Sequence, residues 1–218
     1  MLADWSAECS HDAPTLVVPW HDPSGASQFY DLRAEPFDIA EIPEAERFPA
    51  LGRALRALNA TRSPFLTAKC DAWPLTLDDE DQAATLEALR FELVLEADVA
   101  RFGFSSYIDL IFRERSVFIS RHHQQARLDG LVRRAQKLPH DSAALELILR
   151  PAVIDLITPL EGFAATCYVT AVGPDPEAAA HAWANALEDI VHLLRSRDLE
   201  PARGSATLDT AASAQSAG

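Results

Sequence analysis

The sequence predicts an α+β fold, a two-layer sandwich in which a mainly antiparallel sheet of about five strands carries helices on one face. Three observations lead to this prediction. Several segments alternate residue types with the period of a strand, others place apolar residues at helical spacing, and two stretches of the second half resemble each other. The predicted architecture follows the logic of ferredoxin-like folds, although no motif assigns it to one of them.

The first 63 residues are predicted to be an N-terminal extension with one helix that packs on the main domain. Residues 15–20 and 28–33 are short apolar runs separated by turn-forming residues, which favours two strands. Residues 48–59 repeat apolar side chains at helical spacing, and Pro49 suits a first helical turn. We therefore expect the one helix of this extension at residues 48–59.

The main α+β domain is predicted to span residues 64–200. It opens with a strand at residues 65–73, where small residues alternate with polar or bulky ones. A short helix is expected to begin at the acidic residues 78–81 and to end near Leu89. Residues 201–218 are small, polar and aperiodic, which predicts a disordered tail.

A duplicated β-β-α unit is the main architectural expectation. The stretches Phe91–Val99 and Leu145–Val153 share the pattern Glu-Leu-x-Leu, and each is followed by a Gly-Phe pair and an amphipathic helix. Because internal repeats constrain a fold strongly, we expect two such units, near residues 91–138 and 145–197. Ser120 and Asp175 are the predicted N-caps of the two helices.

Composition narrows the classes of partner. The formal net charge of −14 at pH 7 disfavours nucleic acid and anionic membrane surfaces. The chain has no apolar run long enough to span a bilayer and no leader pattern, so we expect a cytoplasmic protein without a membrane partner. The three cysteines lack metal or redox spacing and are expected to be free thiols. No metal or cofactor is predicted.

Candidate functional residues follow from the strand alternation, because the helices are expected to cover only the apolar face. The opposite, polar face is predicted to carry Lys69, Asp71, Glu92, Tyr107, Asp109, Glu146, Arg150 and Tyr168. Carboxylates beside a lysine or arginine can transfer protons, and tyrosines can stack on a ligand. Antiparallel sheets also commonly turn a polar face to water or to a second copy, and this interpretation is favoured.

A basic helix is the second candidate surface. Residues 121–137 hold five arginines and lysines, and Asp129 is the only acidic residue among them. Such a helix can recognise phosphate or an acidic partner, but its charges more often pair with carboxylates of the same chain or of a second copy.

The primary functional hypothesis is a binding or interaction protein that uses the polar sheet face or the basic helix, as a homodimer or with a small-molecule ligand. The alternative is a motif-free hydrolase or isomerase with Asp71, Asp109 and Tyr107 or Tyr168 as catalytic candidates. Its N-terminal segment, including His21, would fold over them, and this hypothesis predicts a partly buried pocket with carboxylates of raised pKa. RNA stacking on the tyrosines is a third hypothesis, which the neighbouring glutamates disfavour.

Overall fold

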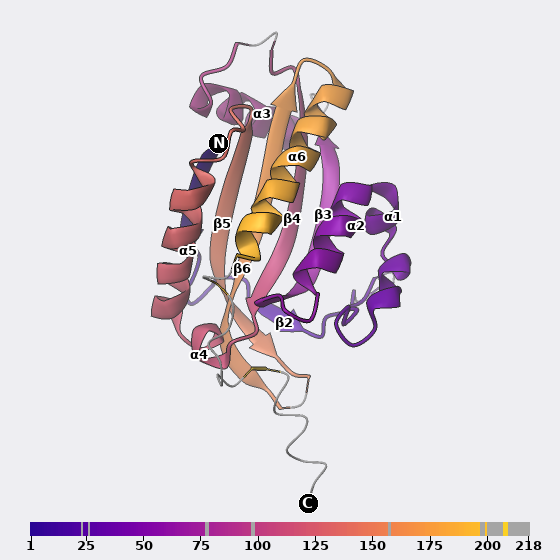
Figure 1. Cartoon of the computed structure of the whole chain (residues 1–218), viewed down its shortest axis with the longest axis vertical. Helices are drawn as coiled ribbons and strands as arrows, with labels where there is room; N and C mark the ends of the chain where they lie inside the picture. The colour runs from indigo at the N-terminus through magenta and orange to yellow at the C-terminus, as the bar shows by residue number, and fades with distance from the viewer. Residues whose placement is uncertain are drawn as a thin grey trace, which may run out of the picture.

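Six strands form one open sheet (Figure 1) in the order β1-β5-β6-β4-β3, and β2 pairs with β5 as well. The computed structural model of the chain describes residues 1–22, 24–25, 27–76, 79–96, 99–156, 158–196, 199 and 207–208. The strands are β1 (Leu2–Ala7), β2 (Leu16–Val18), β3 (Phe65–Leu75), β4 (Phe102–Phe112), β5 (Ala143–Ile154) and β6 (Leu160–Gly173). Except for residues 207 and 208, the predicted tail lies outside the described residues.

The sheet is mostly, but not entirely, antiparallel. Strands β3, β4, β6 and β5 pair antiparallel in that order, whereas β1 and β2 both run parallel to β5. β1 pairs with residues 144–149 and β2 with residues 152–154, so two short strands share one edge of β5 end to end. The opposite edge of the sheet is β3.

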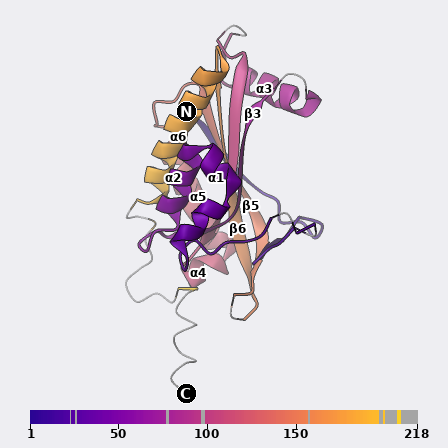
Figure 2. The same cartoon turned by 90° about the vertical axis from the view of Figure 1, so that its right-hand side faces the viewer.

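Helices α2, α5 and α6 cover one face of the sheet (Figures 1 and 2). The helical segments are η1 (Pro36–Glu41), α1 (Pro43–Arg47), α2 (Pro49–Leu58), α3 (Glu80–Glu92), α4 (Arg115–Phe118), α5 (Arg121–Ala135) and α6 (Pro176–Leu194). The two predicted N-caps are formed: Ser120 accepts a hydrogen bond from the backbone N–H of His123, and Asp175 accepts one from that of Ala178. These caps satisfy backbone donors that a helix start leaves without internal partners.

The main core lies between these helices and the alternate residues of the central strands. In β4, Phe104 and Ile108 point toward α6, where Trp183 is the largest core side chain. The Trp183 indole packs 4.5 Å from the ring of Phe104, between ring centroids, and its Nε1 donates a 2.8 Å hydrogen bond to Ser106 Oγ. A buried indole N–H thus has a partner, which removes the cost of burying it unpaired.

The predicted strand at residues 91–99 is wrong, so the first β-β-α unit lacks its first strand. Phe91 and Glu92 are the last two residues of α3, and Leu93 is its C-cap. Leu86, Leu89 and Leu93 are spaced three and four residues apart, so the leucines that suggested a strand also complete a helical stripe. The second unit is present as β5, β6 and α6.

The sequence predicted helices on one face of the sheet, but the structure has helices on both faces. α3 lies on the side of the sheet opposite α6 (Figure 2), where Leu86 and Leu89 pack with Val172 of β6. Glu92, predicted on a strand of the polar face, instead lies exposed at the end of α3.

The first 63 residues contribute more to the fold than one helix. The expected helix is present as α2, together with η1 and α1, and the expected strand at residues 15–20 is present as β2. β1 was not predicted. The expected strand at residues 28–33 does not form, and only an isolated bridge joins Gln28 to His21.

Replacing glycine with alanine is expected to have opposite effects on the free energy of unfolding at two positions. A Cβ on Gly162 in β6 would lie 2.5 Å from the Phe118 carbonyl oxygen, whereas a Cβ on Gly130 in α5 would meet no atom within 4 Å. We expect Gly162→Ala to lower the free energy of unfolding by about 1–3 kcal/mol through overpacking. Gly130→Ala should raise it by about 0.5–1 kcal/mol, because alanine favours a helix interior. Urea unfolding followed by circular dichroism measures both, and a Gly162→Ala protein as stable as the parent would contradict the packing.

Candidate functional site

The sheet face away from α6, here called the polar face, carries a separate apolar cluster at each of its two ends. At one end α3 packs on Val172 and Ala144. At the other end Val18, Leu66 and Ile111 form a separate apolar cluster, against which Phe29 packs. The polar side chains predicted from the strand alternation therefore lie between two apolar clusters.

A row of residues crosses the middle of the polar face from strand to strand. The register places Asp71 of β3 beside Tyr107 of β4, Tyr107 beside Tyr168 of β6, and Tyr168 beside Glu146 of β5. The ring centroids of the two tyrosines are 5.8 Å apart, and Trp73 approaches Tyr107 at 6.2 Å. The row is thus an aromatic strip with a carboxylate at each end, and it unites four of the predicted site residues.

The next row holds a buried carboxyl group, Asp109, with 7 % of its surface exposed. Thr166 Oγ1 donates a 2.7 Å hydrogen bond to Asp109 Oδ1, and Arg150 Nη1 donates a 3.1 Å bond to Thr166 Oγ1. Arg150 Nε in turn donates to Glu8 Oε2 at 2.9 Å. Burial raises the pKa of Asp109, although Thr166, Lys69 and Arg150 act in the opposite direction.

A cavity of about 480 Å³, here called the β3 cavity, opens where β3 meets residues 20–44. These residues, described except for 23 and 26, are called the wall segment. Lys69, Asp71 and Tyr107 line the cavity from the sheet, and Trp20 and His21 line it from the wall segment. Three catalytic candidates from the sequence, Asp71, Tyr107 and His21, therefore meet at one cavity.

The geometry of β3 explains why one cavity collects so many of its residues. All five residues from Thr67 to Asp71 line the cavity, although successive residues of a regular strand point to opposite faces. The pairing of β3 with β4 is shifted between Thr67 and Cys70, as at a β-bulge. Bulges redirect side chains and are frequent at sheet edges, and β3 is an edge strand.

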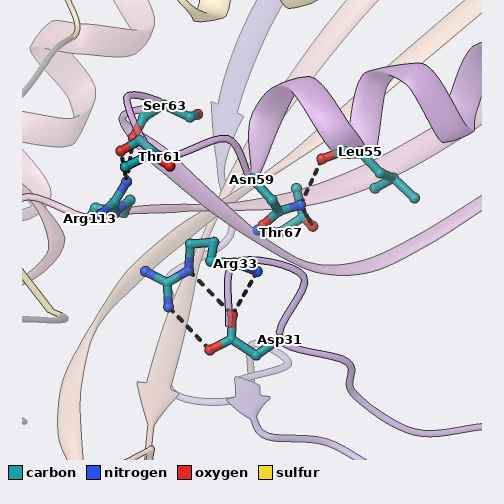
Figure 3. A network of polar contacts seen from close by, with 8 residues as sticks. All are labelled: Asp31, Arg33, Leu55, Asn59, Thr61, Ser63, Thr67 and Arg113. Carbon is teal, nitrogen blue, oxygen red and sulfur yellow. Dashed lines mark hydrogen bonds and ion pairs between the residues drawn. The ribbon is translucent and has the colours of Figure 1, made fainter. Parts of the chain in front are cut away.

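Polar contacts hold the cavity walls in place (Figure 3). Asn59, just past α2, donates to Thr67 Oγ1 at 2.7 Å and accepts from Thr67 N at 3.1 Å. In the wall segment, Arg33 and Asp31 form an ion pair with 3.4 Å between Nε and Oδ1. The sequence pattern marked Asn59 only as a helix stop, because a contact between a helix end and the next strand leaves no periodic signal.

A second link, between Trp20 and β3, closes the wall segment onto the sheet. Trp20 Nε1 donates a 3.0 Å hydrogen bond to the Ala68 carbonyl oxygen, and Lys69 Nζ lies 5.0 Å from the centroid of the Trp20 ring. The indole thus accepts a cation over its face while its N–H uses a backbone acceptor at the edge of the sheet.

The nearby carboxylates make the electrostatic potential at Cys70 and Tyr107 in the cavity wall more negative. Burial raises the pKa of the Cys70 thiol to about 12, and the charges of Glu44, Asp71 and Asp109 act in the same direction. Burial also raises the pKa of Tyr107, again with help from Asp109 and Asp71. Both groups stay protonated at pH 7, so Cys70 is not an activated nucleophile.

Other predicted residues lie apart from the cavity. Glu146 and Arg150 belong to β5, on the far half of the polar face, and Asp109 is not among the cavity-lining residues. Burial raises the pKa of Glu146, and the charge of Glu8 adds to this shift. Within the described residues, no group of three or more histidine, cysteine or acidic side chains is arranged to hold a metal ion.

The basic helix, α5, lies on the other side of the sheet. Arg127 pairs with Glu114 at 4.0 Å, and Arg134 donates to Gly130 O and to Ser196 Oγ. Arg127 thus pairs with a carboxylate of the same chain, and the pairing expected for the other charges of α5 stays a prediction.

Comparison of the chain with models of protein families, with curated proteins and with solved structures finds no match. In the part of the chain that the structure describes, no helix combines the length and the apolar character needed to cross a bilayer.

The buried carboxyl group of Asp109 predicts a pH dependence of stability. Because folding raises its pKa, the ionised carboxylate destabilises the folded state at pH values above the folded pKa. This destabilisation disappears as the pH falls below the unfolded pKa, where the group is protonated in both states. Asp109→Asn should therefore be stabilised relative to the parent at pH 7 and much less so near pH 3, by about 1.4 kcal/mol for each unit of the shift. Urea unfolding at several pH values measures this difference. Asp141→Asn, at an exposed turn, is the matched control, because it makes the same chemical change away from the Asp109 network.

Proposed function

We propose that this protein binds a small organic molecule in the β3 cavity. The observation that carries the proposal is the convergence of Lys69, Asp71 and Tyr107 from the sheet with Trp20 and His21 from the wall segment around one cavity. Its volume of about 480 Å³ falls within the roughly 300–1,000 Å³ typical of small-molecule sites. Aromatic walls with a few convergent polar groups are also typical of such sites.

The contacts around the cavity support a site formed before the ligand arrives. The Asn59–Thr67 pair of hydrogen bonds holds the start of β3, and the Trp20–Ala68 bond holds the wall segment. A preformed site loses less conformational entropy on binding. The free thiols of Cys9, Cys70 and Cys167 support a reducing compartment, so we propose a cytoplasmic setting. The homodimer expected from the sequence stays a prediction, which light scattering of the full chain tests.

A motif-free hydrolase or isomerase is the second candidate function. The raised pKa of Asp109 favours it, because a buried carboxyl group that holds its proton more strongly than usual can act as an acid or a base. Asp109 lies directly opposite Thr166 in the pairing of β4 with β6 and is not among the cavity-lining residues, so a substrate would have to extend beyond the cavity lining to reach it. Conversion of a bound molecule that Asp109→Asn abolishes, without loss of binding, would favour the enzyme over the binding protein.

A cavity-filling substitution tests the binding proposal. Ala68→Phe adds an aromatic ring at a half-buried position in the cavity wall while leaving the backbone acceptor of Trp20 in place. We expect small fragments detected by ligand-observed NMR to bind this variant at least tenfold more weakly than the parent. Ala126→Phe, at an exposed position of α5, is the control and should bind them as the parent does. Equal binding to Ala68→Phe would place the ligand elsewhere and contradict the proposal.

A further inference from the structure

We infer that the β3 cavity selects organic cations, a primary or substituted ammonium group attached to an apolar or aromatic body. This inference rests on the proposed function and names the class of ligand for that same cavity.

The charged groups around the cavity are unequal in sign. Four carboxylates line it, Asp22, Glu41, Glu44 and Asp71, and Lys69 is the single lysine or arginine among its described lining residues. His21 also lines the cavity and is exposed. The carboxylates come from the wall segment and from β3, so they face the cavity from both sides. An anion would meet repulsion from both walls, whereas a cation would be attracted.

Lys69 shows how the cavity accommodates an ammonium group. Its Nζ lies 5.0 Å from the centroid of the Trp20 ring, within the distance at which an aromatic face attracts a cation. The wall thus already holds one ammonium group, supplied by the chain itself. Tyr30 and Tyr107 add further aromatic surface to the lining, where the cation of a ligand can be placed in the same way.

The carboxylates keep the capacity to accept from a ligand. Asp71 Oδ1 accepts a hydrogen bond from the backbone N–H of Ala72, and Asp22 Oδ1 accepts one from that of Ser24. A carboxylate has about four acceptor positions, so each of these bonds orients the side chain without exhausting it. The same bonds limit the rotation of both groups, which lowers the entropy lost when a cation binds.

The protonation of the two weak acids in the wall agrees with this assignment. Nearby carboxylates add to the effect of burial in raising the pKa of Cys70 and that of Tyr107. A field that opposes a thiolate and a phenolate favours a positive charge at the same place. Both groups stay neutral and leave the carboxylates as the charged partners of a ligand.

Three probes of nearly equal size and shape test the inference: benzylammonium, benzyl alcohol and benzoate. Binding to the full chain is measured by ¹⁵N chemical-shift titration at low and at moderate salt. We expect benzylammonium to bind at least tenfold more tightly than benzyl alcohol and benzoate to shift no cavity amide. The advantage of benzylammonium should shrink as salt is added, because screening weakens attraction between exposed charges.

Charge-removing variants identify the groups responsible. Glu44→Gln with Asp71→Asn should weaken benzylammonium at least tenfold and leave benzyl alcohol unchanged, since both variants keep the shape of the side chain. Glu87→Gln, an exposed change on α3, is the control and should alter neither dissociation constant. Unchanged binding of benzylammonium to the double variant, with benzyl alcohol also unchanged, would overturn the assignment to these carboxylates.

The outcomes separate this inference from the proposed function. If benzyl alcohol or benzoate binds in the cavity as tightly as benzylammonium, the ligand class is wrong and the binding site stands. If Ala68→Phe weakens the binding of neutral or anionic fragments while benzylammonium does not bind the parent protein, the inferred ligand class is wrong and the proposed binding site still stands. If no probe and no fragment responds to the cavity-filling change, both proposals fail.

Discussion

The alternation of side chains along the central strands is the constraint on which the rest of this structure depends. In β4, Phe104, Ser106 and Ile108 turn to α6, so Tyr107 and Asp109 must turn to the opposite side. Among the described residues, α2, α5 and α6 pack on the first side, whereas α3 and a separate apolar cluster pack on the second. Between the two apolar clusters of the second side, Asp109 and Thr166 lie buried, with 7 % and 5 % of their surfaces exposed. The candidate cavity lies at the β3 edge of this sheet, where the wall segment meets the shifted strand.

Asp109 shows what this arrangement costs and what offsets the cost. A carboxylate with little access to water is unfavourable unless other groups compensate for its charge. Thr166 donates to it, Arg150 donates to Thr166, and Glu8 accepts from Arg150, so the compensation passes from β4 through β6 and β5 to the residue after β1. The net effect is still unfavourable to the charge. A group kept in this condition at the centre of a sheet is a common mark of a functional surface, although structural ion-pair networks produce the same shift.

Long regular patterns were predictable from the sequence, and local irregularities were not. The strands that became β3, β4, β5 and β6 each show ten or so residues of alternation, and α5 and α6 begin at residues suited to capping. The prediction for residues 91–95 was wrong because Leu93 fits two patterns equally well. It alternates with its neighbours as in a strand, and it also continues the helical spacing of Leu86 and Leu89. The residues of the polar face on β4, β5 and β6 were predictable because alternate residues of a strand point to opposite faces of the sheet. A pocket between the N-terminal segment and the sheet was expected only under the enzyme hypothesis. Its position at β3 was not predictable, since it depends on a shifted pairing near Lys69 and on a wall segment without periodicity, and neither leaves a pattern in the residues.

The parallel pairing of β1 with β5 has a consequence for how the protein is made. Leu2 lies beside Ala144 and Ala7 beside Leu149, so β1 can take its place in the sheet only after β5 has been synthesised. Until then, β1 has no strand to pair with, and its apolar residues are exposed to water or bound by a chaperone. Closing so long a loop is slow compared with forming a hairpin such as β5 and β6. The β5 side of the sheet is therefore completed late in synthesis, by a strand that is made before the other five.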